Sequence, residues 1–333
     1  MSAPTSGPTS GPASRPTSRP ASGPATGPAA SGLAVTGFLP YRPPYHWQAM
    51  LAFLAARAVP ATEQVAASTW HRSLRLEGVA RQDDAGEGIG PAGTVSVTDE
   101  PQHQALRVVM SPQLAGHEAE VLARLGRMFD VDCDPQAVED ALGPLAAANR
   151  GLRLPGTPDP FELMVRAILG QQVTVAAART IATRFVARFG VPLPNAMPDE
   201  PGQVTHLFPS AARIAAIGAG ALGEIGIIRA RGEAIIAAAR ALDDGTLQLV
   251  PGAPVEPALA SLTTIRGIGP WTAHYVAMRA LGWRDAFPPR DVAVLKAMQV
   301  RTPAEAARQA EGWRPWRSYA VLHLWRSLAV SAN

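Results

Sequence analysis

Asp291 is the residue in this sequence best placed to do chemistry. Two prolines, Pro288 and Pro289, stand shortly before it, and the apolar pattern of a helix begins directly after it. The prolines stiffen the approach, and the helix start fixes the direction of the side chain. A carboxylate held in this way can stabilise a developing positive charge and can orient or deprotonate water. An aspartate at a helix start is more often a simple cap, and that alternative is compatible with the chemical role.

A glycine-bracketed turn precedes this aspartate, within the stretch 262–276. Gly267 and Gly269 can adopt backbone angles closed to other residues, and they leave the chain bare for close approach. Pro270 suits the first position of a helix, where its missing N–H costs nothing. Unpaired backbone N–H groups at such a helix start are a favourable site for a phosphate. A tight turn between two packed helices is the alternative, because a Gly-x-Gly pair alone is not specific.

The same stretch resembles the second half of a helix-hairpin-helix, a motif that grips the DNA backbone without reading its sequence. Ile265 and Ile268 are expected to point inward and to hold the turn to its flanking helices. The segment 263–333 contains ten Arg and Lys residues against four Asp and Glu, whereas 112–262 contains twelve against sixteen. An anionic partner would therefore dock near the turn, although a solvated basic face also accounts for the excess.

Composition limits the remaining possibilities. The chain has 333 residues, 47% of them hydrophobic, and a net charge of +3. Cys133 is the only cysteine, so no disulfide framework, zinc cluster or four-cysteine iron–sulfur site can be built, which is typical of a reducing cytoplasm. No run of about 18 apolar residues is present to span a membrane, and no basic-then-apolar signal sequence begins the chain.

The chain divides into three parts by composition and periodicity. Residues 1–35 consist mainly of Pro, Ser, Thr, Gly and Ala and predict a disordered tail. Residues 36–115 predict an α+β domain with an antiparallel sheet, and residues 116–333 have the apolar period of an all-α domain. The helix and the strand-like runs of the α+β domain are expected at 48–57, 69–76, 94–97 and 105–109.

Similarity to a known family extends from about residue 38 to the C-terminus. The stretches that carry it are PPYHW (43–47), GLRLPG (151–156), RAILGQ (166–171) and WRPWRSYA (313–320). They resemble the AlkA type of DNA-3-methyladenine glycosylase II, in the helix-hairpin-helix superfamily of base-excision DNA glycosylases. The resemblance implies a mostly helical fold, with an antiparallel-sheet lobe and two helical lobes that flank a cleft. It also implies hydrolysis of the N-glycosidic bond of a flipped-out alkylated purine, which leaves an abasic site.

The resemblance also assigns roles to individual residues. Asp291 becomes the hydrolysing acid, which suits a bond whose cleavage builds positive charge on the sugar. The predicted base pocket consists of Phe53, Trp271, Tyr275 and Trp325. The predicted DNA contacts are Gln172, Gly267, Gly269 and Thr272. The backbone carbonyls of Thr263, Ile265 and Gly267 match positions that can hold a monovalent cation.

Aromatic rings suit a methylated purine, because its positive charge gains about 0.5–2 kcal/mol from each cation–π contact. Trp271 and Tyr275 are four residues apart and therefore share one helix face. For each of the four aromatics, a plain role in the core is the alternative. Gln172 stands where the family inserts an apolar leucine into the gap in the duplex. It can fill that space and hydrogen-bond the orphaned base, or Gln171 and Gln172 can bond backbone groups between helices.

The single lysine decides between subclasses. Relatives that also nick the strand form a Schiff base through a lysine, which in the resemblance would stand at Trp271. Lys296 lies five residues past Asp291, about 140° around a helix, and is expected to face away. We therefore expect a monofunctional, monomeric enzyme without required cofactors or an iron–sulfur cluster, which binds damaged double-stranded DNA in the cytoplasm at the nucleoid. A non-catalytic damaged-DNA-binding module and an oxidised-guanine glycosylase/lyase are the alternatives.

Overall fold

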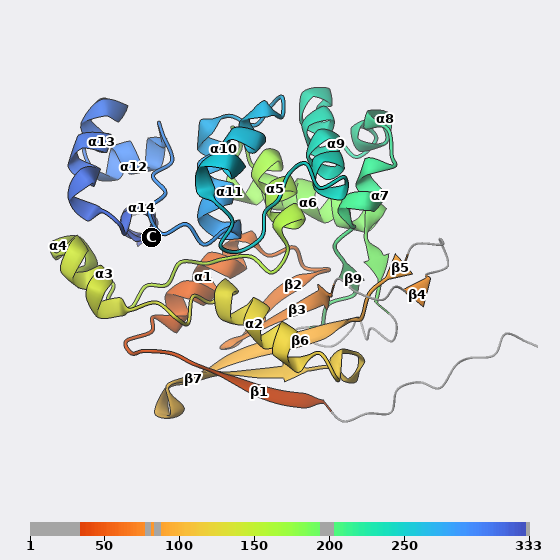
Figure 1. Ribbon diagram of the computed structural model, residues 1–333, viewed down its shortest axis with the longest axis horizontal. Helices are drawn as coiled ribbons and strands as arrows, with labels where there is room; N and C mark the ends of the chain where they lie inside the picture. The colour runs from red at the N-terminus through yellow and green to blue at the C-terminus, as the bar shows by residue number, and fades with distance from the viewer. Residues whose placement is uncertain (1–33, 77–80, 83–87, 194–202, 331–333) are drawn as a thin grey trace, which may run out of the picture. The chain divides into compact units, whose positions relative to one another are not determined.

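The computed structural model describes residues 34–76, 81–82, 88–193 and 203–330 (Figure 1). The described part is mostly helical and contains a five-stranded antiparallel sheet, as expected from the sequence. Nearly all of the predicted tail lies outside the described residues, and its last residue, Val35, begins a strand. None of the helices in the described ranges is both long and apolar enough to cross a membrane.

The five-stranded sheet has the order β1-β7-β6-β3-β2, and all its neighbours are antiparallel. Its strands are β1 (Val35–Pro40), β2 (Glu63–Ala66), β3 (Thr69–Arg75), β6 (Ala92–Glu100) and β7 (Ala105–Met110). The runs predicted at 69–76, 94–97 and 105–109 form β3, β6 and β7. Two short pairs, β4 (Arg81–Gln82) with β5 (Gly88–Ile89) and β8 (Val191–Pro192) with β9 (His206–Leu207), complete the strands.

Two helices cover the sheet, α1 (Trp47–Arg57) and α2 (Glu118–Met128). They contribute Leu51 and Leu125 to one core cluster with Val97 of β6. Contact between α2 and β1 is close, since a Cβ at Gly37 would lie 2.9 Å from a methyl group of Leu122. The helix just beyond residue 116 thus packs on the sheet. The division of the ordered chain at 115 and 116 stays a prediction.

The remaining described helices are α3 (Pro135–Leu142), α4 (Pro144–Ala147), α5 (Pro160–Leu169), α6 (Val175–Phe189), α7 (Ala211–Ala215), α8 (Ala219–Gly223), α9 (Arg229–Asp243), α10 (Val255–Thr264), α11 (Pro270–Ala280), α12 (Val292–Ala297), α13 (Pro303–Ala310) and α14 (Arg317–Val330). Helices α5, α6, α9, α10 and α11 share the largest core cluster. Between α5 and α6 the chain turns at Gln172, whose φ is 56°, and Thr174 caps α6 by accepting the N–H of Ala177 at 3.2 Å.

A buried ion network joins the sheet to α5. Glu162 of α5 accepts hydrogen bonds from Arg72 of β3 and from Arg166 one helical turn later, the latter at 2.7 Å. Arg166 also donates to Glu63 of β2 at 3.0 Å, and the other oxygen of Glu63 accepts the indole N–H of Trp70 at 2.9 Å. Burial alone would raise the pKa of Glu162, but the two guanidinium groups hold it below its usual value.

Candidate active site

The hairpin connects α10 to α11, which lie side by side in Figure 1. Ile265 is 8% exposed and Ile268 is 4% exposed, so the prediction that both point inward is confirmed. Gly267 has a φ of 96°, and a Cβ there would lie 3.1 Å from the Cβ of Ala234. Gly269 caps α11 with an ordinary φ of −85°, and a Cβ there would meet no atom within 4 Å. The fold therefore requires a glycine at Gly267, whereas at Gly269 it leaves open space in front of the helix start.

We expect the two alanine variants of this turn to fail in different ways. Gly267→Ala should lower the free energy of unfolding by about 1–2 kcal/mol, because its left-handed backbone penalises a side chain. Gly269→Ala should fold normally and bind duplex DNA roughly tenfold more weakly, because a methyl group would keep a phosphate from N–H donors worth about 1.5 kcal/mol each. Urea unfolding and anisotropy of a labelled duplex measure the two effects. Equal DNA affinity of Gly269→Ala and the unaltered protein would contradict the open phosphate site.

A glutamine on the neighbouring loop fastens the hairpin. The side-chain amide of Gln171 donates to the carbonyl oxygen of Gly267 at 2.8 Å and to the hydroxyl of Thr272 at 3.1 Å. Gln171 thus joins the loop after α5 to the hairpin and to α11, so the alternative role given above for Gln171 and Gln172 agrees with the contacts of Gln171. Thr272 is only 3% exposed and its hydroxyl is used in this contact, so its predicted contact with DNA stays a prediction. Gln172 is exposed, and Val173 beside it is 36% exposed, so polar and apolar surface stand together at the predicted wedge.

The carbonyl oxygens predicted to hold a cation keep lone pairs for it. Ile265 accepts the N–H of Ile268 at 2.9 Å and Gly267 accepts the amide of Gln171, which leaves one lone pair on each oxygen. Thr263 lies in the last turn of α10, where carbonyl groups have no donor within the helix. Side chains offer no substitute in the described part of the chain, where no group of three or more His, Cys, Asp and Glu could hold a metal ion.

Asp291 caps α12 and at the same time faces the predicted base pocket. Its Oδ1 accepts the N–H of Val294 at 2.8 Å, and its Oδ2 accepts the indole N–H groups of Trp271 at 2.8 Å and of Trp325 at 3.3 Å. The residue is 6% exposed. Asp291 is therefore the helix cap that the first alternative describes, and its second oxygen contacts two of the predicted pocket aromatics, while its chemical role stays a prediction.

Three of the four predicted pocket aromatics lie together beside this carboxylate. The rings of Trp271 and Tyr275 stack with centroids 5.3 Å apart and planes at 9°, and the ring of Trp325 lies 6.2 Å from that of Tyr275. All three are half-buried, so each retains surface that another molecule can touch. Trp271 and Tyr275 come from α11, which begins at the hairpin, and Trp325 comes from α14.

Two arginine side chains pack against the ring of Phe53, the fourth predicted pocket aromatic. The guanidinium carbon of Arg57 lies 3.8 Å from the ring centroid of Phe53, and that of Arg279 lies 5.1 Å from it. Arg279 also donates to the hydroxyl of Tyr275 at 2.7 Å. Burial alone would raise the pKa of Tyr275, but Arg279 and Arg57 hold it below its usual value. Neither arginine was predicted, although each follows its aromatic partner by four residues, the spacing at which helix side chains meet.

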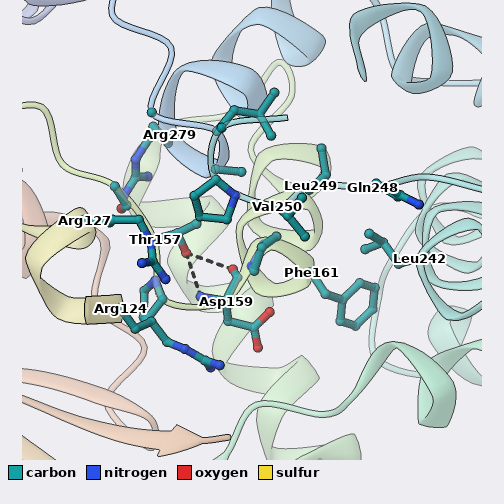
Figure 2. Close-up of a pocket in the computed structure, with 18 of the residues that line it drawn as sticks. Arg124, Arg127, Thr157, Asp159, Phe161, Leu242, Gln248, Leu249, Val250 and Arg279 are labelled. Atoms are coloured by element: carbon teal, nitrogen blue, oxygen red, sulfur yellow. Dashed lines mark hydrogen bonds between the residues drawn. The ribbon is translucent and has the colours of Figure 1, made fainter. Parts of the chain in front are cut away.

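Two cavities in the described part of the molecule are lined by residues other than the predicted pocket aromatics. One of about 1020 Å³ is lined by Arg124, Arg127, Thr157, Asp159 and other residues between the sheet and the helices (Figure 2). Another of about 170 Å³ borders Asp291, His274 and Arg317. None of the four predicted pocket aromatics lines either cavity. The single lysine, Lys296, is exposed on α12.

Comparison with known proteins agrees with this geometry. Residues 36–159 match the AlkA N-terminal domain, and residues 165–313 match the HhH-GPD superfamily base excision DNA repair protein. DNA-3-methyladenine glycosylase 2 of Escherichia coli (strain K12) is 42% identical over 287 residues, which are 86% of this chain and 95% of that protein.

Two further relatives extend the comparison. The probable bifunctional transcriptional activator/DNA repair enzyme AlkA of Mycobacterium tuberculosis (strain ATCC 25618 / H37Rv) is 37% identical over 314 residues, which are 91% of this chain and 59% of that protein. The solved structure of 3-methyladenine DNA-glycosylase from Archaeoglobus fulgidus has the same fold, with a TM-score of 0.70, 21% identity, and coverage of 87% of this chain and 97% of that chain.

The fold and the hairpin are those of the helix-hairpin-helix superfamily of base excision DNA repair proteins. The N-terminal match and the identity to the Escherichia coli protein narrow the class further. The chain belongs to the AlkA-type family of DNA-3-methyladenine glycosylases.

Proposed function

We propose that this protein removes alkylated purines from double-stranded DNA by hydrolysing their N-glycosidic bonds, and that Asp291 is its catalytic residue. The observation that supports it best is the position of the carboxylate, which contacts the indole groups of Trp271 and Trp325 next to the stacked ring of Tyr275. A flipped-out nucleotide that places its base against these rings would bring its sugar near the carboxylate. The hairpin at Gly269 would hold the adjacent phosphate.

The reaction on this proposal breaks the bond between C1′ and the base nitrogen. Its electron pair leaves with the base, which departs neutral because the alkylated purine was positively charged. Positive charge develops on the sugar, and the Asp291 carboxylate stabilises it, while a water oxygen forms the new bond to C1′ and releases a proton to the surrounding solvent. Because N–H donors fix both carboxylate oxygens, preorganised electrostatic stabilisation is the main contribution that we assign to Asp291.

The proposal assigns the remaining predicted residues to DNA binding. Gln172 fills the gap left by the flipped nucleotide, with the exposed Val173 as apolar support. The backbone N–H groups at the start of α11 bind a phosphate, and the carbonyls of Thr263, Ile265 and Gly267 hold a monovalent cation beside it. When bound, such a cation would neutralise phosphate charge. The protein acts as a monomer in the cytoplasm at the nucleoid.

Release of free bases from methylated DNA tests the activity. We expect chromatography to identify 3-methyladenine and 7-methylguanine among the products, and we expect the DNA strand to remain intact until alkali cleaves the abasic site. Borohydride should trap no covalent adduct, because Trp271 stands where the nicking relatives keep their lysine and Lys296 is exposed elsewhere. Binding to damaged DNA without base release would support the non-catalytic alternative, and a trapped adduct would support a lyase.

A further inference from the structure

The Asp291 carboxylate is held from two directions. On one side, the N–H of Val294 fixes Oδ1 as part of the helix cap of α12. On the other, Trp271 of α11 and Trp325 of α14 both donate to Oδ2, at 2.8 Å and 3.3 Å. Two indole N–H groups from different helices thus share one acceptor atom, and indole nitrogens can only donate.

This arrangement leaves the carboxylate with one rigid orientation. The Trp271 ring cannot move freely, because it stacks on Tyr275, whose hydroxyl is in turn held by Arg279 at 2.7 Å. Asp291 as a residue is 6% exposed, so water competes little with the indole donors. Hydrogen bonds from ordered donors to a buried charge are among the stronger ones in proteins.

We propose that Trp271 and Trp325 are positioning residues, whose indole N–H groups orient the Asp291 carboxylate toward the cationic sugar of the transition state. This role is additional to the contact of their rings with the flipped base, and it rests on the proposed function of Asp291. Trp271 follows Gly269 by two residues, so the helix start that would receive the phosphate also carries one of the two donors. On this proposal, the N-terminal end of α11 both binds the DNA backbone and orients the carboxylate.

The test compares two abasic-site analogues in otherwise identical duplexes. One has a pyrrolidine ring, whose protonated nitrogen carries a positive charge close to the position of C1′, and the other has a neutral tetrahydrofuran ring. Trp325→Phe and Trp271→Phe retain a six-membered aromatic ring. They lose the five-membered ring of the indole, which carries the N–H donor. We expect each to lower the affinity for the pyrrolidine duplex and the single-turnover rate of base release by about 10- to 100-fold, the range typical of groups that orient a functional ligand. Affinity for the tetrahydrofuran duplex should change by less than about threefold.

Controls separate this role from a structural one. Trp316→Phe should match the unaltered protein, because Trp316 packs on Tyr319 and Arg284. In an Asp291→Asn background, the tryptophan changes should have no further effect on the preference for pyrrolidine, as a double-mutant cycle requires of coupled groups. Circular dichroism and urea unfolding check that every variant is folded, and the two tryptophan variants are independent of each other.

The possible results of these measurements either support or overturn the positioning role. Loss of the pyrrolidine preference in Asp291→Asn and its reduction in both tryptophan variants supports the positioning role. If Asp291→Asn loses the preference and both tryptophan variants retain it, the positioning role is wrong and the proposed function stands. Equal weakening for both duplexes in the tryptophan variants also overturns the positioning role. If Asp291→Asn itself retains the preference together with base release, the proposed function fails, and the positioning role fails with it.

Discussion

Asp291→Asn should lower the single-turnover rate of methylated-base release by about 10²–10³-fold, the cost of removing one preorganised charge-stabilising group. A neutral amide cannot offset the positive charge that develops on the sugar. The fold should survive, because asparagine is as good a helix cap as aspartate and its oxygen can still accept the N–H of Val294. Affinity for a duplex with a tetrahydrofuran abasic site should stay close to that of the unaltered protein. Quenched-flow kinetics and anisotropy measure the rate and the affinity.

A second capping aspartate provides the matched control. Asp134 caps α3 by accepting the N–H groups of Gln136 and Ala137, at 3.1 Å and 3.3 Å. Asp134→Asn makes the same chemical change at the same kind of helix position, where the other carboxylate oxygen contacts the exposed Arg42 and not an indole, and should leave base release unaltered. Base release by Asp291→Asn at the rate of the unaltered protein would exclude a catalytic role for this carboxylate. Loss of activity in both variants would point to a general effect on stability.

Glu162→Gln should reduce the free energy of unfolding by about 3–5 kcal/mol. Glu162 forms ion pairs with both Arg72 and Arg166. The Glu162 side chain is 2% exposed, and the Arg72 side chain is 5% exposed. Arg166 retains Glu63 as a partner in the variant, whereas Arg72 loses its direct ion-pair partner between the sheet and α5. Urea unfolding measures the change.

Two further variants sharpen this measurement. Replacing Arg72 and Glu162 together by methionine should recover most of the loss, because removing a buried pair costs less than breaking it. Glu233→Gln breaks the exposed pair with Arg229 on α9, where the Arg229 side chain is 89% exposed, and should have no measurable effect. Equal stability of Glu162→Gln and Glu233→Gln would show that the buried network contributes nothing beyond a surface pair.

The hairpin was predictable because its requirements are local. Gly267 needs a left-handed backbone and Ile265 and Ile268 need burial, and each requirement is met within a few residues of chain. Helices with a clear apolar stripe, such as α2, were predictable for the same reason. The two outer strands, β1 and β2, escaped prediction. β2 has only four residues, and β1 contains Gly37 and Pro40, residue types that are depleted in strands.

The bonding around the candidate site could not be derived from local pattern. Trp325 stands 34 residues from Asp291, and their contact depends on how α14 docks on α12. The resemblance to a family supplied Trp325 as a pocket residue, but periodicity gave no reason to expect a hydrogen bond from its indole. The contacts of Arg57 with Phe53 and of Arg279 with Tyr275 were predictable from the four-residue spacing of each pair, but that spacing does not indicate that the arginines belong to the candidate site.

The position of α14 in the sequence affects the order in which the parts of the candidate site form. Helix α14 supplies Trp325 to a cluster whose other members come from α1, α11 and the cap of α12, so the cluster is complete only when segments far apart in the sequence have packed together. Contacts between residues this distant in sequence form late, after the intervening chain has collapsed. A chain that has formed the hairpin but has not yet docked α14 would therefore have the proposed phosphate site without the complete proposed base pocket. On the proposed function, hydrolysis depends on the docking of α14, whereas contact of the hairpin with the DNA backbone does not.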